Sequence, residues 1–192
     1  MKGGPLRKIR ALAAITTLCA VAAAAHALTA AELQRLLETS PRPSVQFQEV
    51  RESPWLSSPV TSRGTMRSAP GVLEKRVEFP RKETWRLRAD RVEWRAAADG
   101  PVKQILFSEA PALAALSDLM RLVVAGNIVA LQRDFGIQIS GDERVWRAQL
   151  KPRNREIGRT LDEVELQGTG RTLQVIIVVQ RQGERTTTRL QP

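Results

Sequence analysis

Hydrophobic and polar residues alternate along most of the chain, in short runs separated by Gly, Pro, Ser or Asp. A period of two is that of a β-strand with one buried face. It predicts strands over residues 45–51, 61–67, 72–79, 84–87, 91–94 and 102–107. Asp99-Gly100 is a strong turn signal, so the sixth run is expected to pair back as a hairpin. Such short, evenly spaced strands are typical of an antiparallel sheet or barrel rather than of βαβ units.

The pattern over residues 29–38 is helical. Thr29 is a candidate N-cap, and Glu32 follows three residues later, as in a capping box. Apolar residues share one face of this segment, namely Leu33, Leu36 and Leu37. We therefore expect a short amphipathic helix, ended by the Ser-Pro-Arg-Pro sequence of residues 40–43.

A second helical pattern interrupts the strands over residues 111–124. Its apolar stripe consists of Leu113, Leu116, Met120 and Val123 or Val124. A shorter helix is expected over residues 127–135. Strands are then predicted over residues 136–140, 144–151, 161–167 and 171–181, with 186–190 as a closing edge strand.

These elements predict one domain that is mainly β with some α. No internal repeat, linker or low-complexity tract divides residues 28–192. The expected architecture is a curved antiparallel sheet, or incomplete β-barrel, covered by a helical lid. Helices over such a sheet enclose an apolar interior that side chains or a ligand can fill.

The N-terminus reads as a cleavable export signal over residues 1–27. Four basic residues precede an apolar run, and Ala25-His26-Ala27 provides the small-x-small pattern of a cleavage site. The apolar run is short for a membrane span, which leaves a retained anchor as the alternative. Cys19 follows Leu18 rather than a small residue, so we interpret it as part of the apolar run and not as a lipidation site. The expected compartment is the periplasm.

Removal of this segment changes the available chemistry. It contains the single Cys and the single His, and the chain has no Tyr. Thiolate nucleophiles, imidazole bases and nearly every zinc site are thereby excluded from the mature protein, which leaves carboxylates as the only acid–base groups. We expect no catalytic residue, and a hydrophobic binding site requires no metal or cofactor. The net charge of +10 falls to about +6. Export argues against nucleic acid as the partner of these scattered basic residues.

The order of several motifs resembles that of the LolA-like family of periplasmic lipoprotein carriers and their lipid-binding relatives. Those motifs are Val45-Gln46-Phe47-Gln48-Glu49, Ser62-Arg63-Gly64-Thr65-Met66, Ala69-Pro70-Gly71-Val72-Leu73 and the strand end Phe79-Pro80. The helical insertion after Phe107 falls where the family places its lid. The resemblance covers most of the mature chain.

Two further runs are similar to a divergent subgroup that accompanies lipid or aryl polyene biosynthesis and export, namely Leu73-Glu74-Lys75-Arg76 and residues 111–116. The resemblance implies a lipoprotein or polyene-lipid cargo, an inner-membrane exporter, an outer-membrane acceptor and a monomeric carrier. Two positions depart from the general carriers. Ala69 replaces an Arg and Leu73 replaces an aromatic residue, and both are linked in the family to gated lipid entry and release. The resemblance thus implies the apolar cavity but not the standard hand-off.

Candidate cavity residues follow from strand alternation and the helical stripe. They are Phe47, Leu73, Val77, Phe79, Trp85, Leu87, Trp94, Phe107, Leu113, Leu116, Met120 and Trp146. The alternative for each is a place in the core, since an apolar stripe is first a core signal. Trp55 lies in a predicted turn, where we expect it to pack under the loop, with contact to a membrane or a ligand mouth as the alternative.

Three functions remain open at this stage. The first is a periplasmic carrier that shields the hydrophobic part of a lipoprotein or lipid-linked product on its way to the outer membrane. The second is a lipid-responsive sensor or adaptor that binds a protein partner. The third, a lipid-modifying enzyme, would depend on carboxylates, but no pair of them has a spacing that demands a shared site. Glu163 and Glu165 are expected on one face of a solvated edge.

Overall fold

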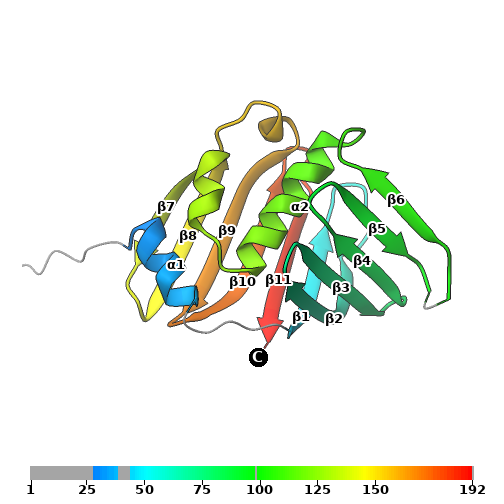
Figure 1. The fold of residues 1–192 in the computed structure, drawn as a ribbon, viewed down its shortest axis with the longest axis horizontal. Coiled ribbons are helices and arrows are strands. Elements are labelled where there is room, and N and C mark those ends of the chain that lie inside the picture. Colours follow the sequence, from blue (N-terminus) through cyan, green and yellow to red (C-terminus); the bar gives the residue numbers. More distant parts are fainter. Residues whose placement is uncertain (1–27, 39–43, 98, 192) are drawn as a thin grey trace, which may run out of the picture.

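The computed structural model describes residues 28–38, 44–97 and 99–191. In this part of the chain, eleven antiparallel strands form one open, curved sheet, and two α-helices cover one of its faces (Figure 1). The expected mainly β fold with a helical cover is confirmed. The expected signal peptide and the helix stop at residues 40–43 lie outside the described residues.

The first six strands form an antiparallel meander in chain order. They are β1 (Ser44–Glu52), β2 (Val60–Ala69), β3 (Val72–Phe79), β4 (Glu83–Leu87), β5 (Arg91–Arg95) and β6 (Val102–Leu106). The second part of the sheet holds β7 (Phe135–Gly141), β8 (Val145–Pro152), β9 (Leu161–Thr169), β10 (Thr172–Gln180) and β11 (Arg185–Gln191). The expected hairpin of β5 with β6 is present.

The last strand joins these two parts. The order is β6-β5-β4-β3-β2-β1-β11-β10-β9-β8-β7, so β11 lies between β1 and β10 and the edges are β6 and β7. The prediction of an edge strand over residues 186–190 is therefore wrong. Thr188 pairs with Glu49 and Leu190 with Phe47, contacts that span most of the chain. Alternation within a segment identifies a strand but does not reveal such distant partners.

The first helix, α1 (Ala30–Glu38), begins with the expected capping box. The Glu32 backbone N–H donates to Thr29 Oγ1 at 3.2 Å, and the Thr29 backbone N–H donates to Glu32 Oε2 at 2.7 Å. The two residues thus satisfy each other's otherwise unpaired donors. Leu33 and Leu37 of this helix are buried against the sheet side of the molecule.

The second helix, α2 (Pro111–Val124), has the predicted bounds, with Pro111 in its first turn, where its missing N–H is tolerated. The predicted helix over residues 127–135 is instead a short 3₁₀-helix, η1 (Val129–Arg133), and Phe135 already begins β7. A second 3₁₀ turn, η2 (Ile157–Arg159), precedes β9. Neither α-helix of the described ranges has both the length and the apolar character needed to cross a bilayer.

The core has two parts that differ in how the helices cover the sheet. The larger one packs α1, α2 and η1 against the inner side chains of β7 to β10. The smaller one contains Phe47, Met66 and Leu73, with Met120 and Val124 of α2 packed against it. Fewer large side chains thus fill the space between α2 and the first half of the sheet.

Candidate functional site: a cavity between α2 and the sheet

A cavity of about 530 Å³ lies between α2 and the inner face of β1 to β5, β10 and β11. Its apolar wall is formed by Met66, Leu73, Val77, Trp85, Leu87, Val92 and Val178 of the sheet and by Leu113, Leu116 and Met120 of α2. A space of this size and lining suits an alkyl or polyene chain, because it removes apolar surface from water without requiring hydrogen bonds.

The two ends of the cavity differ in exposure and polarity. At one end Met66 and Leu73 are each 1% exposed, and Val92 is also buried. At the other end the exposed lining residues are Arg51, Val60, Pro80 and Arg81, and the half-buried Gln180, Glu184 and Thr186 add polar groups. This second end, which we term the open end, is formed by the ends of β1, β2 and β10 and the loop after β3. A bound amphiphile would therefore place its tail inward and its polar group at the open end.

An ion pair crosses the floor of the cavity. Lys75 Nζ on β3 donates to both carboxylate oxygens of Glu49 on β1, each at 2.7 Å. The Thr188 hydroxyl on β11 donates to Glu49 Oε2 at 2.9 Å, and Lys75 Nζ lies 4.8 Å from the centre of the Phe47 ring. Both charges are largely shielded from solvent. The pair thus spans β3, β2, β1 and β11, where the two parts of the sheet meet.

Gly64 lies on the intervening strand β2, where a side chain does not fit. It faces Phe47 on β1 and Val77 on β3. A Cβ atom at position 64 would collide with the backbone carbonyl of Arg76. Only a residue without a side chain permits this close approach of β2 and β3.

A second carboxylate of the cavity lining, that of Glu83, accepts hydrogen bonds from two indole groups. Trp85 Nε1 donates to Glu83 Oε2 at 3.1 Å, and Trp94 Nε1 donates to the same oxygen at 3.3 Å. The two rings lie 5.7 Å apart between centroids and are tilted by 37°. Because Glu83 receives both donors, the two rings are held side by side on β4 and β5, and Trp85 presents its apolar surface to the cavity.

The structure brings seven of the twelve candidate residues together at this cavity. They are Leu73, Val77, Trp85, Leu87, Leu113, Leu116 and Met120. The other five do not line it. Phe47 is buried beneath Lys75, and the Trp94 ring packs beside the Trp85 ring. Phe107 is half-buried just after β6, where its backbone N–H donates to the Asp90 carbonyl.

Two candidates lie elsewhere for clear physical reasons. Trp146 is buried in the larger core, where its ring occupies the space over Gly168 and its Nε1 donates to the Gly170 carbonyl at 3.0 Å. Phe79 is 49% exposed, and the Arg63 guanidinium lies 5.4 Å from the centre of its ring. The pairing of β2 with β3 shifts register between Arg63 and Gly64, so Phe79 does not follow the alternation of Leu73 and Val77.

The charged pair on the cavity floor was not among the residues expected from the sequence. A signal was available, since Lys75 lies between Leu73 and Val77 and shares their side of the strand. A cation in an inward series of apolar residues indicates either a partner or a ligand, because an unpaired buried charge is costly. Its partner Glu49 is 26 residues away, and nothing in the local pattern identifies it.

Trp55 projects from the loop between β1 and β2. Its side chain is 79% exposed, so the expectation that it packs under the loop is wrong. The neighbouring Pro54 approaches Gly183 of the turn between β10 and β11. The loop therefore stands beside the open end of the cavity, with an indole directed to solvent.

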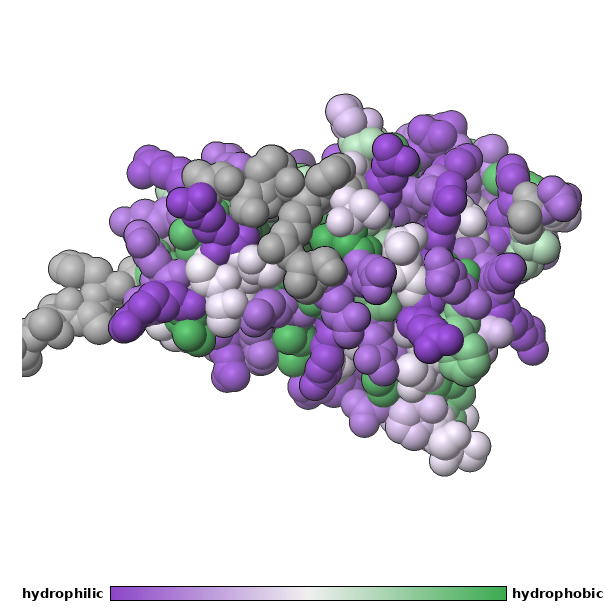
Figure 2. Space-filling model, turned by 90° about the horizontal axis from the view of Figure 1, so that it is seen from below, coloured by the Kyte–Doolittle hydropathy of each residue, from purple (hydrophilic) through white to green (hydrophobic). Residues whose placement is uncertain are grey.

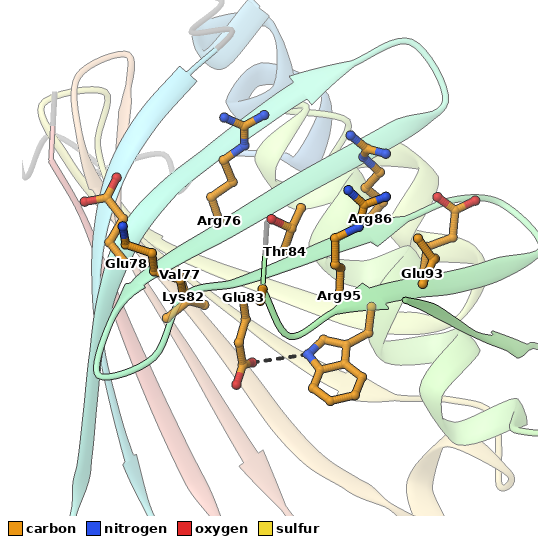
Figure 3. A pocket seen from close by; sticks show the side chains of 12 residues that line it. Arg76, Val77, Glu78, Lys82, Glu83, Thr84, Arg86, Glu93 and Arg95 are labelled. Carbon is orange, nitrogen blue, oxygen red and sulfur yellow. Dashed lines mark hydrogen bonds between the residues drawn. The ribbon is translucent and has the colours of Figure 1, made fainter. Parts of the chain in front are cut away.

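A smaller hollow of about 360 Å³ lies beside β3 to β6 and is richly charged. Figure 3 shows Arg76 and Arg86 pointing to one side of the strands and Glu83 to the other, toward an indole. Arg76 and Arg86 both donate to Glu74, at 2.7 Å and 2.8 Å. Glu74 thus compensates part of the charge of the two arginines, as is typical of ion pairs on a solvated outer face.

Other carboxylates are also held by basic groups. The Arg88 hydrogen bond is the main reason that the pKa of Glu93 is lowered, and Arg91 adds to the effect. Glu163 and Glu165 share the outer face of β9, as expected, and pair with Lys151 and Arg147. They do not lie at an edge, because β9 is between β8 and β10. In the described residues, no group of three His, Cys, Asp or Glu is arranged to hold a metal ion.

The outside of the molecule contrasts with the cavity. Figure 2, which looks at the molecule from below, shows a mostly hydrophilic surface with apolar groups in small patches. Within the chain the apolar side chains are concentrated between the helices and the sheet. A polar exterior around an apolar cavity is what a water-soluble binder of hydrophobic ligands requires.

Comparison with known protein families shows to which family the chain is related. Residues 22–191 match the family described as outer membrane lipoprotein carrier protein LolA-like. The chain belongs to this LolA-like family. The resemblance expected from the sequence is thereby confirmed at the level of the family, and the fold is one of lipoprotein-sorting type. A comparison with curated protein sequences gives no match.

Solved structures with a similar fold include three distant proteins. A LolA superfamily protein from Nitrosomonas europaea is 11% identical, with a TM-score of 0.44, and the match covers 86% of this chain and 93% of that one. A DUF1329 family protein from Desulfovibrio piger is 9% identical, with a TM-score of 0.43 and coverages of 82% and 86%. An outer membrane lipoprotein-sorting protein domain from Vibrio parahaemolyticus is 9% identical, with a TM-score of 0.40 and coverages of 85% and 92%.

Proposed function

We propose that this LolA-like protein is a periplasmic carrier. It binds the acyl or other hydrophobic part of a lipoprotein or lipid-linked product in the cavity and moves it toward the outer membrane. The observation that carries the proposal is the cavity of about 530 Å³ between α2 and the sheet, apolar within and polar at its open end.

Binding by hydrophobic contacts does not require a particular chemical type of tail. Each methylene group transferred from water to the apolar wall contributes about 0.8 kcal/mol. The residues that line the cavity come from seven strands, α2 and adjoining turns, and most are at least half-buried, so the cavity exists before a ligand enters. A preformed site spends little of the binding free energy on ordering the protein.

Helix α2 is the element that admits the ligand. Leu113, Leu116 and Met120 face the cavity, whereas Leu119 and Val123 of the same helix are buried in the larger core. A small outward movement of α2 would enlarge the cavity without breaking the hydrogen bonds between strands. The departure at Leu73 keeps the cavity apolar, because Leu73 forms part of its buried end.

We propose no enzymatic activity. Of the three carboxylates that line the cavity, Glu49 and Glu83 accept hydrogen bonds from Lys75, Thr188, Trp85 and Trp94, and Glu184 accepts one from Gln180. A carboxylate held in this way as an acceptor is poorly placed for general acid–base catalysis. The exposed Trp55 loop is compatible with a protein contact, so a lipid-responsive adaptor is the second candidate.

Transfer between vesicles separates the carrier from the adaptor. Donor vesicles loaded with a fluorescent acyl lipid are mixed with unlabelled acceptor vesicles, with and without the mature protein. A carrier accelerates the transfer in proportion to protein concentration. An adaptor binds the lipid without accelerating its transfer, and a protein that binds none contradicts both functions. Val145→Trp, a change at a side chain that is 63% exposed and outside the cavity, is the matched control for variants in the wall.

A further inference from the structure

The charged groups of the cavity are not equivalent. Its lining contains three carboxylates and three cationic groups, Glu49, Glu83, Glu184, Arg51, Lys75 and Arg81. Whether a given charge is already compensated within the protein decides what remains for a ligand. The carboxylates and the cationic groups differ in how far other groups of the protein already bind them.

Each of the three carboxylates accepts a hydrogen bond from the protein. Glu49 is paired with Lys75 and Thr188, and Glu83 receives the two indole N–H groups. The third, Glu184, accepts a hydrogen bond from Gln180 Nε2 at 2.7 Å. Each carboxylate thus has a donor within the protein, and the donor of Glu49 is a cation.

The two arginines at the open end are different. Lys75 is used by Glu49, but neither Arg51 nor Arg81 forms an ion pair with any carboxylate in the described part of the chain. Arg51 is the last residue but one of β1, on the same side of the strand as Glu49, and Arg81 lies in the loop between β3 and β4. Their guanidinium groups are exposed, so a ligand can reach them without displacing a protein partner.

We infer that the cargo is an amphiphile with an anionic headgroup, a carboxylate or a phosphate. Its tail lies under α2 against the Leu73 end of the cavity, and its headgroup lies at the open end with Arg51 and Arg81. Arginine presents a planar set of donors that matches both headgroups. This inference rests on the proposed binding of hydrophobic tails in the same cavity and names the chemistry of the headgroup.

The position of the Glu49–Lys75 pair supports this orientation. It lies between the buried apolar end and Arg51, which follows Glu49 by two residues on the same side of β1. An anionic group that entered more deeply would meet Glu49, whereas one at the open end meets the two arginines first. The arrangement thus favours entry of the tail first.

Binding of matched ligands to the mature protein tests the inference. Isothermal titration calorimetry compares a medium-chain saturated fatty acid with its methyl ester, with the alkyl phosphate and with the primary amine of the same length. We expect the fatty acid and the alkyl phosphate to bind about three- to tenfold more tightly than the ester. The difference between these two separates a carboxylate from a phosphate as the preferred headgroup. Their advantage over the ester should shrink as salt is added.

Two sets of variants make the comparison specific. Arg51→Gln with Arg81→Gln should reduce the affinity for the fatty acid to that for the ester and leave the ester unchanged. Arg144→Gln removes an equal type of charge at a side chain that is 90% exposed in the turn after β7, and it should have no effect. Circular dichroism confirms that each variant is folded.

The outcomes separate this inference from the proposed function. If the acid and the ester bind equally well, the headgroup inference is overturned and the carrier proposal stands. If the amine binds best, the charge of the headgroup is opposite to that inferred. If none of the four ligands binds, the cavity does not take hydrophobic tails and both proposals fail.

Discussion

Lys75 Nζ lies 2.7 Å from Glu49 Oε2, and this ion pair joins β3 to β1 across the strand between them. It stands on the floor of a cavity whose other inner residues are mostly apolar. Thr188 on β11 extends the link into the second part of the sheet. The pair therefore fixes how the two parts curve around the space below α2.

Removing one partner of this pair should destabilise the fold. Glu49→Gln or Lys75→Met leaves a partly buried charge without its counter-ion, and we expect a loss of about 1–3 kcal/mol in the free energy of unfolding. Urea denaturation followed by circular dichroism measures it. The double variant Glu49→Leu with Lys75→Met should recover much of the loss, since no charge is then left unpaired. Additive losses in the double variant would contradict a direct coupling.

Substitution of two tryptophans should distinguish a residue of the cavity wall from a residue of the core. Trp146→Ala empties a fully packed site and should lower the free energy of unfolding by about 3–5 kcal/mol. Trp85→Ala removes a half-buried ring of the cavity wall, so we expect a smaller loss of about 1–2 kcal/mol and an affinity for an acyl ligand that is lower by about fivefold. Denaturation and lipid titration measure the two effects. Equal effects of both variants on binding would mean that Trp85 is also only core.

Filling the cavity should abolish binding. Leu116→Trp on α2 places a larger ring in the space for the ligand, and the affinity for an acyl ligand should fall by at least about tenfold. The open end allows the ring to be accommodated at a cost of about 1 kcal/mol or less in stability. Titration with a fluorescent fatty acid measures the affinity. The control Val145→Trp should bind normally, and unchanged binding by Leu116→Trp would place the ligand elsewhere.

Low pH should reduce the folding stability through protonation of Glu93 on the outer face of β5. The pKa of Glu93 is lowered first by its hydrogen bond from Arg88, which is 2.7 Å long, and then by Arg91. A carboxylate with a lowered pKa in the folded state stabilises that state above its ordinary pKa of about 4.3, and the stabilisation is lost as the pH falls through the lowered value. The chain should thus lose stability below about pH 4.5. Glu93→Gln should reduce this acid dependence in thermal melts between pH 3 and pH 7, a range chosen to span the carboxyl titration, and an unchanged slope would exclude Glu93 as a contributor.

Much of the local structure could be predicted from the sequence. The bounds of β3 and α2 follow from alternation and from an apolar stripe headed by Pro111, and the capping box of Thr29 and Glu32 fixes the start of α1. The place of β11 could not be predicted in this way. Its partners are chosen by contacts with β1, more than 130 residues earlier, and a local pattern contains no information about them.

The site was predictable only in part, for related reasons. Alternation indicates that Trp85 and Trp146 both face inward, but it does not tell which half of the sheet α1 and η1 cover. Trp146 lies in the half of the sheet that α1 and η1 cover and is therefore part of the core, whereas Trp85 lines the cavity. A register shift at Gly64 moved Phe79 out of the series, and the pairing of Lys75 with Glu49 depends on the sheet as a whole.

Native mass spectrometry of the protein, purified from the cells that naturally make it, tests the central claim most directly. The cavity of about 530 Å³ should retain an acylated or polyene species, which extraction and lipid analysis identify. Leu116→Trp, purified in the same way, should be empty, while Val145→Trp should carry the same species. A wild-type protein that is empty and also fails to take up a fluorescent fatty acid would contradict the account and show that the apolar wall serves only the fold.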